Sequence, residues 1–186
     1  MRLFVAVRFP PELAAKASAA LPALRTLRRV QPELMHVTLA FIGNVADDRL
    51  ADVVAAANDA AEGTPSFDLR LAGLGTFPER GAAHVVWLGF ADAAPLIRLA
   101  DRARAALATH SVEFDAKPFR PHLTLARVRD DADRVEQRDI AQAIRDATPP
   151  AGSFRVDALD VIQSVLSPKG PRYTSRATVS LVGGTR

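Results

Sequence analysis

The sequence predicts an α+β fold made of two lobes of similar design. Segments with the pattern of strands and segments with the pattern of helices are interspersed along the 186 residues. The pentapeptides His-Val-Thr-Leu-Ala at 36–40 and His-Leu-Thr-Leu-Ala at 122–126 are near copies, 86 positions apart. With 48% hydrophobic and 24% charged residues, the chain has the composition and length of one globular domain. We therefore expect residues 1–186 to form a single domain.

In the first half of the chain, the hydrophobic pattern predicts two strands, each followed by a helix. The apolar run over 2–9 is typical of a buried strand and ends at consecutive prolines. Apolar residues at helical spacing then predict a helix over 11–24, with proline in its first turn. Residues 36–42 predict a strand that ends at a Gly-Asn pair. Asp47 or Asp48 is expected to cap the next helix.

The second half is predicted to contain five strands and two helices. A Gly- and Pro-rich segment over 75–81 separates the first two of these strands, and prolines before His122 favour an extended approach to the third. The predicted strands are 67–74, 84–90, 122–128, about 154–165 and about 172–181, and the predicted helices are about 93–109 and about 133–146.

Composition excludes several classes of protein. The sequence has no cysteine, so a disulfide framework, a thiolate zinc site and a cysteine nucleophile are excluded. The first ten residues do not have the pattern of a signal peptide, and no apolar run approaches the roughly 18 residues of a membrane span. We expect a cytoplasmic protein with no membrane partner. The basic residues, 21 Arg and 3 Lys, favour either an anionic partner or a charged, solubilising surface.

The two near copies place histidine and threonine at a spacing that suits displacement at phosphorus. In a strand, residues i and i+2 point to the same face, so His36 lies beside Thr38 and His122 beside Thr124. Two imidazoles can divide into a base and an acid near neutral pH, and hydroxyls can bind phosphate oxygens. This chemistry needs no metal or other cofactor. A metal site is disfavoured because neither copy brings a carboxylate at ligand spacing.

The other two histidines are assigned to structure. His84 opens a predicted strand, and His110 follows a predicted helix end, where a cation interacts favourably with the helix dipole.

Several longer strings show a family resemblance that covers nearly the whole chain. These strings are Arg2–Val7, Met35–Gly43, Leu71–Pro78, Val86–Gly89, Phe119–Arg127, Ser164–Pro168 and Gly170–Tyr173. The chain resembles the two-histidine (2H) phosphoesterases, and within them the bacterial and archaeal RNA 2′,3′-cyclic phosphodiesterases long named 2′-5′ RNA ligases.

The resemblance implies a bilobal, pseudo-two-fold fold with a cleft between two antiparallel sheets and helices on the outside. It also implies hydrolysis of a terminal ribose 2′,3′-cyclic phosphate, on RNA or on a nucleotide, to a 2′-phosphate. His36 would protonate the departing O3′, and His122 would activate the attacking water. Thr38, Thr124 and Arg127 would bind the phosphate. No metal or cofactor is implied, and a monomer is expected.

The resemblance further implies that Phe41 contacts the nucleobase. Strict alternation along a strand, however, puts Phe41 and Arg127 on the face opposite their histidines unless a twist or bulge redirects them. The alternatives are core packing for Phe41 and a solvated surface position for Arg127. Pseudo-symmetry also allows the two histidines to exchange their acid and base roles.

Two other functions remain open from the sequence. One is 2′-5′ RNA ligation, in which a ribose hydroxyl replaces water at the same site. The other is a non-catalytic module that binds RNA or nucleotide phosphate without turnover.

Overall fold

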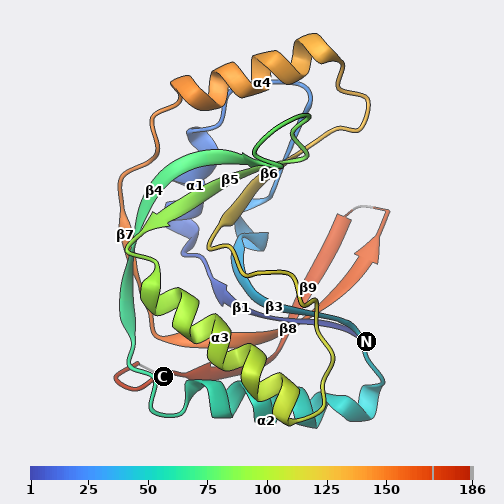
Figure 1. Ribbon diagram of the computed structural model, residues 1–186, viewed down its shortest axis with the longest axis vertical. Helices are drawn as coiled ribbons and strands as arrows, with labels where there is room; N and C mark the ends of the chain where they lie inside the picture. The colour runs from blue at the N-terminus through green and yellow to red at the C-terminus, as the bar shows by residue number, and fades with distance from the viewer. Residues whose placement is uncertain (169, 185–186) are drawn as a thin grey trace.

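Two antiparallel sheets form the framework of the protein (Figure 1). The computed structural model describes residues 1–168 and 170–184. Lys169, Thr185 and Arg186, which the expected span of 1–186 includes, lie outside the described residues. The first sheet has the order β3 (His36–Asn44), β1 (Arg2–Arg8), β8 (Ala158–Ser167), β9 (Gly170–Ser180). The second has the order β2 (Leu27–Arg29), β6 (Leu123–Val128), β5 (Val85–Ala91), β4 (Phe67–Phe77), β7 (Ser153–Val156).

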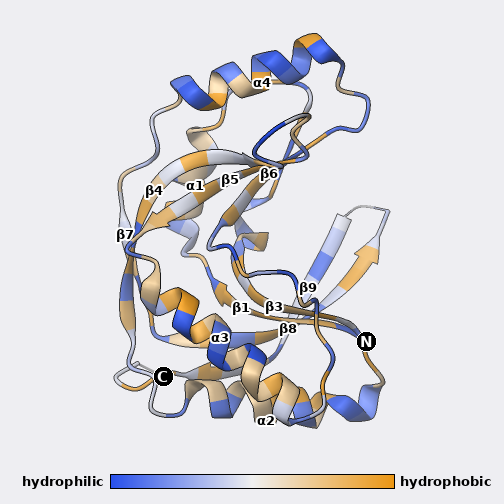
Figure 2. Cartoon of the chain, viewed as in Figure 1, coloured by the Kyte–Doolittle hydropathy of each residue, from blue (hydrophilic) through white to orange (hydrophobic). Residues whose placement is uncertain are grey.

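Helices cover the outer sides of the sheets, so the α+β expectation is confirmed. Helices α2 (Leu50–Ala61) and α3 (Ala94–Thr109) pack on each other and on strands of the first sheet. Helix α4 (Arg134–Asp146) contacts β4 of the second sheet, and α1 (Pro11–Ala19) joins the core through its buried face. Figure 2 shows α4 as mostly hydrophilic, with an apolar side that buries Ile140 and Ile144.

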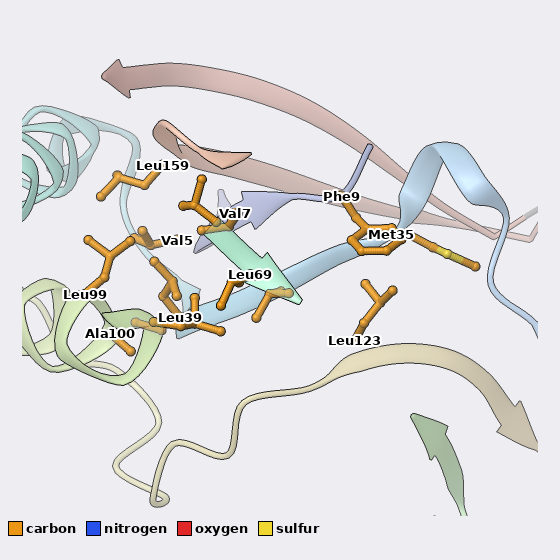
Figure 3. Packing of buried hydrophobic residues seen from close by; sticks show 14 of the residues in the cluster. Val5, Val7, Phe9, Met35, Leu39, Leu69, Leu99, Ala100, Leu123 and Leu159 are labelled. Carbon is orange, nitrogen blue, oxygen red and sulfur yellow. The ribbon is translucent and has the colours of Figure 1, made fainter. Parts of the chain in front are cut away.

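One continuous hydrophobic core connects the two sheets. Figure 3 shows Val5, Leu39 and Leu159 of the first sheet with Leu69 and Leu123 of the second. All five side chains are at most 2% exposed. Burial of such side chains stabilises the fold by roughly 1.5–3 kcal/mol each, and it also fixes the position of β3 relative to β6.

The predicted strand over 154–165 is wrong as a single element. The segment forms two strands, β7 and β8, which separate at Asp157 and belong to different sheets. The Asp157 carbonyl accepts a hydrogen bond from the Leu181 amide at the point of separation. Strand-forming residues lie on both sides of Asp157, and no glycine or proline interrupts residues 154–165, so hydropathy alone did not show where the chain crosses between sheets.

Two boundaries in the first half also differ from expectation. The helix predicted over 11–24 ends at Ala19, and the three-residue strand β2 follows where no strand was predicted. Neither Asp47 nor Asp48 caps α2, because both lie in a short 3₁₀ turn before the helix. The helix α4, by contrast, begins with a capping box, in which the Asp133 carboxylate accepts hydrogen bonds from backbone amides of the first turn.

None of the helices in the described part of the chain combines the length and apolarity that a membrane span requires.

Candidate functional site

The two copies of the repeated motif meet in one cavity of about 660 Å³. His36 and Thr38 enter it from β3 of the first sheet, and His122 and Thr124 enter it from β6 and the residue before it. Strand alternation explains the arrangement, because the intervening Val37 and the residues after each threonine are buried in the core. Residues that lie 86 positions apart in the sequence therefore line a single volume.

Both histidines are held in the same way by the backbone two residues earlier. The Nδ1 atom of His36 lies 2.7 Å from the Leu34 carbonyl oxygen, and that of His122 lies 2.6 Å from the Arg120 carbonyl oxygen. A carbonyl oxygen can only accept, so Nδ1–H is the donor in each case. Each ring therefore presents Nε2 for proton exchange in the cavity, as base when neutral and as acid when protonated.

Burial lowers the pKa of both histidines below the ordinary value of 6.5. The hydrogen bond to Leu34 partly opposes this for His36, and the charge of His122 lowers the pKa of His36 further. The hydrogen bond to Arg120 likewise opposes the shift for His122, whose pKa is lowered further by the charge of Arg127. A charge on His122 thus disfavours protonation of His36.

A β-bulge in each copy redirects the residue five positions after the histidine. In β3, Thr38 pairs with Ala6 and Ala40 with Val5, so Leu39 is an extra residue in the ladder. Because Leu39 and Ala40 are both buried, the alternation shifts by one and Phe41 returns to the face of His36. Phe41 is 36% exposed and lines the cavity, so the core-packing alternative for it is wrong.

The same bulge occurs in the second copy. In β6, Thr124 pairs with Trp87 and Ala126 with Val86, which makes Leu125 the extra residue. Arg127, two residues after this bulge, consequently lines the cavity with His122. In both copies the bulged residue is the leucine of the His-x-Thr-Leu motif.

Aromatic side chains pack against each imidazole, and sequence reasoning did not single them out. The Phe4 ring lies 4.7 Å from the His36 ring between centroids, and the Tyr173 ring meets His36 edge-on at 5.2 Å. The Phe77 ring meets the His122 ring edge-on at 4.9 Å. All three lie in strings quoted for the resemblance, but their contacts depend on cross-strand pairing, which a single sequence does not reveal. We infer that they fix the tilt of the rings.

Further arginines make the cavity suitable for an anion. Arg2 and Arg28 line it together with Arg127. The Arg2 guanidinium lies 5.0 Å from the centre of the Phe41 ring, a cation–π contact on the side of the cavity where Phe41 is exposed. Arg29 also lines the cavity but donates to three backbone carbonyls, one in the last turn of α1 and two in the segment after it.

A family model described as the 2′-5′ RNA ligase superfamily matches residues 9–167, a span that includes both histidine motifs, Phe41 and Arg127. The chain belongs to the 2′-5′ RNA ligase superfamily. Its resemblance to this family, inferred from sequence strings, is thereby confirmed.

Individual relatives match this superfamily member along nearly its whole length. A protein of Thermus thermophilus named RNA 2′,3′-cyclic phosphodiesterase is 35% identical, over 98% of this chain and 91% of that protein. The crystal structure of TT0787 of Thermus thermophilus has a TM-score of 0.79 and 31% identity, and the match covers 100% of each chain. The crystal structure of E. coli LigT complexed with 3′-AMP has a TM-score of 0.75 and 26% identity, over 97% of each chain.

The remaining histidines of this superfamily member occupy other surroundings. His84 is exposed beside the start of β5, and His110 at the end of α3 pairs with Asp59 through Nε2, 2.7 Å from the carboxylate. Within the segments 1–168 and 170–184, no three His, Asp or Glu side chains gather closely enough to form a metal site.

Proposed function

We propose that the protein hydrolyses a terminal ribose 2′,3′-cyclic phosphate, on RNA or on a nucleotide, to a 2′-phosphate. The observation on which the proposal depends is the pair of histidines that present Nε2 to one cavity, each with a threonine beside it. The name of the Thermus thermophilus relative supports the reaction, and the 3′-AMP complex of E. coli LigT supports a nucleotide ligand.

In the proposed reaction the two histidines act on opposite sides of the phosphorus. Neutral His122 accepts a proton from water at Nε2 as the water oxygen forms a bond to phosphorus. Protonated His36 donates its Nε2 proton to O3′ as the P–O3′ bond breaks. The P–O2′ bond remains intact, so the product has a 2′-phosphate and a 3′-hydroxyl. Proton exchange with solvent then restores both histidines.

Neighbouring groups bind the phosphate and the base in this proposal. The Thr38 and Thr124 hydroxyls donate to the two non-bridging oxygens, and Arg127 neutralises charge on the same group. Phe41, exposed at the edge of the cavity, stacks on the nucleobase. Because each sheet supplies one histidine, the two lobes act as one catalytic domain, and a monomer holds the complete site.

The direct test is to incubate the purified protein with 2′,3′-cyclic AMP in excess EDTA and to identify the product. We expect 2′-AMP, because the residues assigned to the reaction are a complete acid–base pair without a metal. Formation of 3′-AMP would reverse the leaving-group assignment. Absence of turnover in EDTA that is restored by added divalent metal would contradict the proposed mechanism.

The pH dependence is expected to be bell-shaped, because one histidine must be neutral and the other protonated. Burial lowers the pKa of each ring below 6.5, so kcat/KM, which reports the free enzyme, should be maximal on the acidic side of pH 6.5. The bound phosphate favours protonated imidazole, so the kcat profile should lie at higher pH. A flat kcat/KM profile between pH 5 and 9 would contradict the two-histidine mechanism.

A further inference from the structure

A second, smaller cavity of about 260 Å³ adjoins the reaction cavity. Thr38, Phe41 and His122 line both cavities, whereas His36 and Thr124, among the described residues, line only the larger one. The smaller cavity therefore meets the reaction centre at the side of His122 and at the exposed ring of Phe41. The proposed mechanism uses none of its other side chains.

The lining of the smaller cavity combines positive charge with aromatic surface. Lys117, Arg120 and Arg104 are the cations, and Phe77 and Phe119 add ring surface next to Phe41. This is the chemistry that single-stranded nucleic acid requires, since cations follow the phosphates and rings stack on the bases. The only carboxylate among the described lining residues is Asp115.

The wall of the cavity is fixed before any ligand binds. The Asp115 amide donates to the Phe41 carbonyl at 2.8 Å, which ties the segment after α3 to β3. Arg104 of α3 donates to the carbonyls of Asp115 at 3.0 Å and of Lys117 at 2.7 Å. Arg104 thus holds the wall, and Lys117 and Arg120 present their charges at its rim.

These rim cations are paired weakly with carboxylates. The Lys117 Nζ lies 3.1 Å from Asp115, and the Arg120 guanidinium lies 2.9 Å from Glu79. The cations are 85% and 60% exposed in their side chains, so both pairs contribute little to stability. A phosphate can replace the carboxylate at little cost, and Asp115 then competes with the ligand for Lys117.

We propose that the smaller cavity binds a second ribonucleotide, next to the one whose cyclic phosphate reacts. The inference rests on the proposed function, because the first nucleotide is placed by His36, His122 and Phe41. Adjacent nucleotides in one strand need adjoining sites, and the two cavities adjoin at Phe41. Lys117 binds the phosphate of the second nucleotide, and Phe119 faces its base.

The second nucleotide can come from two sources with the same chemistry. One is the 5′ neighbour in the strand that ends in the cyclic phosphate. The other is the 5′-hydroxyl end of a separate RNA, which would approach from the His122 side. In that case O5′ forms the bond to phosphorus and loses its proton to His122, while P–O3′ breaks and O3′ takes the proton of His36. The product is a 2′-5′ linkage.

The test compares a mononucleotide with a dinucleotide. Wild-type kcat/KM should be at least about fivefold higher for adenylyl-adenosine 2′,3′-cyclic phosphate than for 2′,3′-cyclic AMP, because a stacked base strengthens binding. Lys117→Ala should lower this ratio by about fivefold. Asp115→Asn should raise it, because the amide oxygen can still accept from the Lys117 amide but no longer attracts its ammonium group. Lys16→Ala, on the exposed side of α1, is the matched control and should leave the ratio unchanged.

A second arm mixes cyclic-phosphate RNA with a 5′-hydroxyl oligonucleotide and measures joined product. A joined product that depends on Lys117, together with a kcat/KM that is no higher for the dinucleotide than for the mononucleotide, would assign the smaller cavity to the end of a separate RNA. Equal rates for both substrates, no joined product and no effect of Lys117→Ala would overturn the inference, while turnover of cyclic AMP would still support the proposed function. If cyclic AMP is not turned over, the proposed function fails. Equilibrium binding of the mononucleotide and the dinucleotide by the same variants then tests whether the smaller cavity binds a second nucleotide.

Discussion

Alanine in place of either histidine is expected to lower kcat for 2′,3′-cyclic AMP by about 100-fold or more, because each variant removes one of the two proposed proton-transfer groups. In the proposed mechanism, His36→Ala removes the acid for O3′, and His122→Ala removes the base for water. Among the described residues that line the cavity, His36 and His122 are the only histidines, so no other imidazole there can substitute for them. Initial rates at saturating substrate measure the effect.

The double variant and a matched control make this test specific. Groups that act as a unit give non-additive losses, so His36→Ala/His122→Ala should be little slower than either single variant. His84→Ala removes an exposed imidazole and should retain wild-type kcat. A fall of less than about tenfold in either catalytic-site variant, or an equal fall in His84→Ala, would contradict the assigned roles.

Gly75→Ala is expected to lower the free energy of unfolding by about 1–3 kcal/mol. Gly75 of β4 lies directly across from Trp87 of β5, and a Cβ at Gly75 would lie 2.3 Å from the indole ring. The indole must move, and its neighbour Phe77, 5.3 Å away between ring centroids, contacts His122 in turn. We therefore expect kcat to fall as well, because the His122 ring loses its fixed tilt.

Urea denaturation measures the stability of this variant, and Trp87→Phe provides the control. Phenylalanine lacks the indole atoms that the new Cβ would meet, so Gly75→Ala/Trp87→Phe should be more stable than the two single changes predict together. An interaction free energy of order 1 kcal/mol is expected for such contacting residues. Simple additivity, or a Gly75→Ala protein with wild-type stability, would show that the indole does not constrain this position.

The sequence predicted which side chains share the cavity more completely than it predicted the path of the chain. His36, Thr38, His122 and Thr124 were found from a repeated spacing, because the period of a strand fixes which side chains share a face. Phe41 and Arg127 could not be placed by that rule. The bulges at Leu39 and Leu125 depend on how β1 and β5 pair with the motif strands, and this pairing is a property of the assembled sheets.

Two other differences have the same physical origin. The separation of β7 from β8 at Asp157 is decided by which sheet each half joins, and both halves have strand-forming sequences. The contacts of Phe4, Tyr173 and Phe77 with the imidazoles are made across strands far apart in the sequence. Local patterns indicate most of the helices and strands, whereas tertiary pairing determines where a strand changes sheet and which aromatic residue lies beside which histidine.

Each sheet takes strands from both sides of the segment between α3 and β6. The first combines β1 and β3 with β8 and β9, and the second combines β2, β4 and β5 with β6 and β7. A cut in the segment between α3 and β6 would therefore leave two fragments, neither of which contains a complete sheet. Although the motif is duplicated, neither copy belongs to a fragment that contains a complete sheet. The distance between the two imidazoles is thus a property of the whole fold. The site is disrupted when the whole fold unfolds, and it forms again when the whole fold refolds.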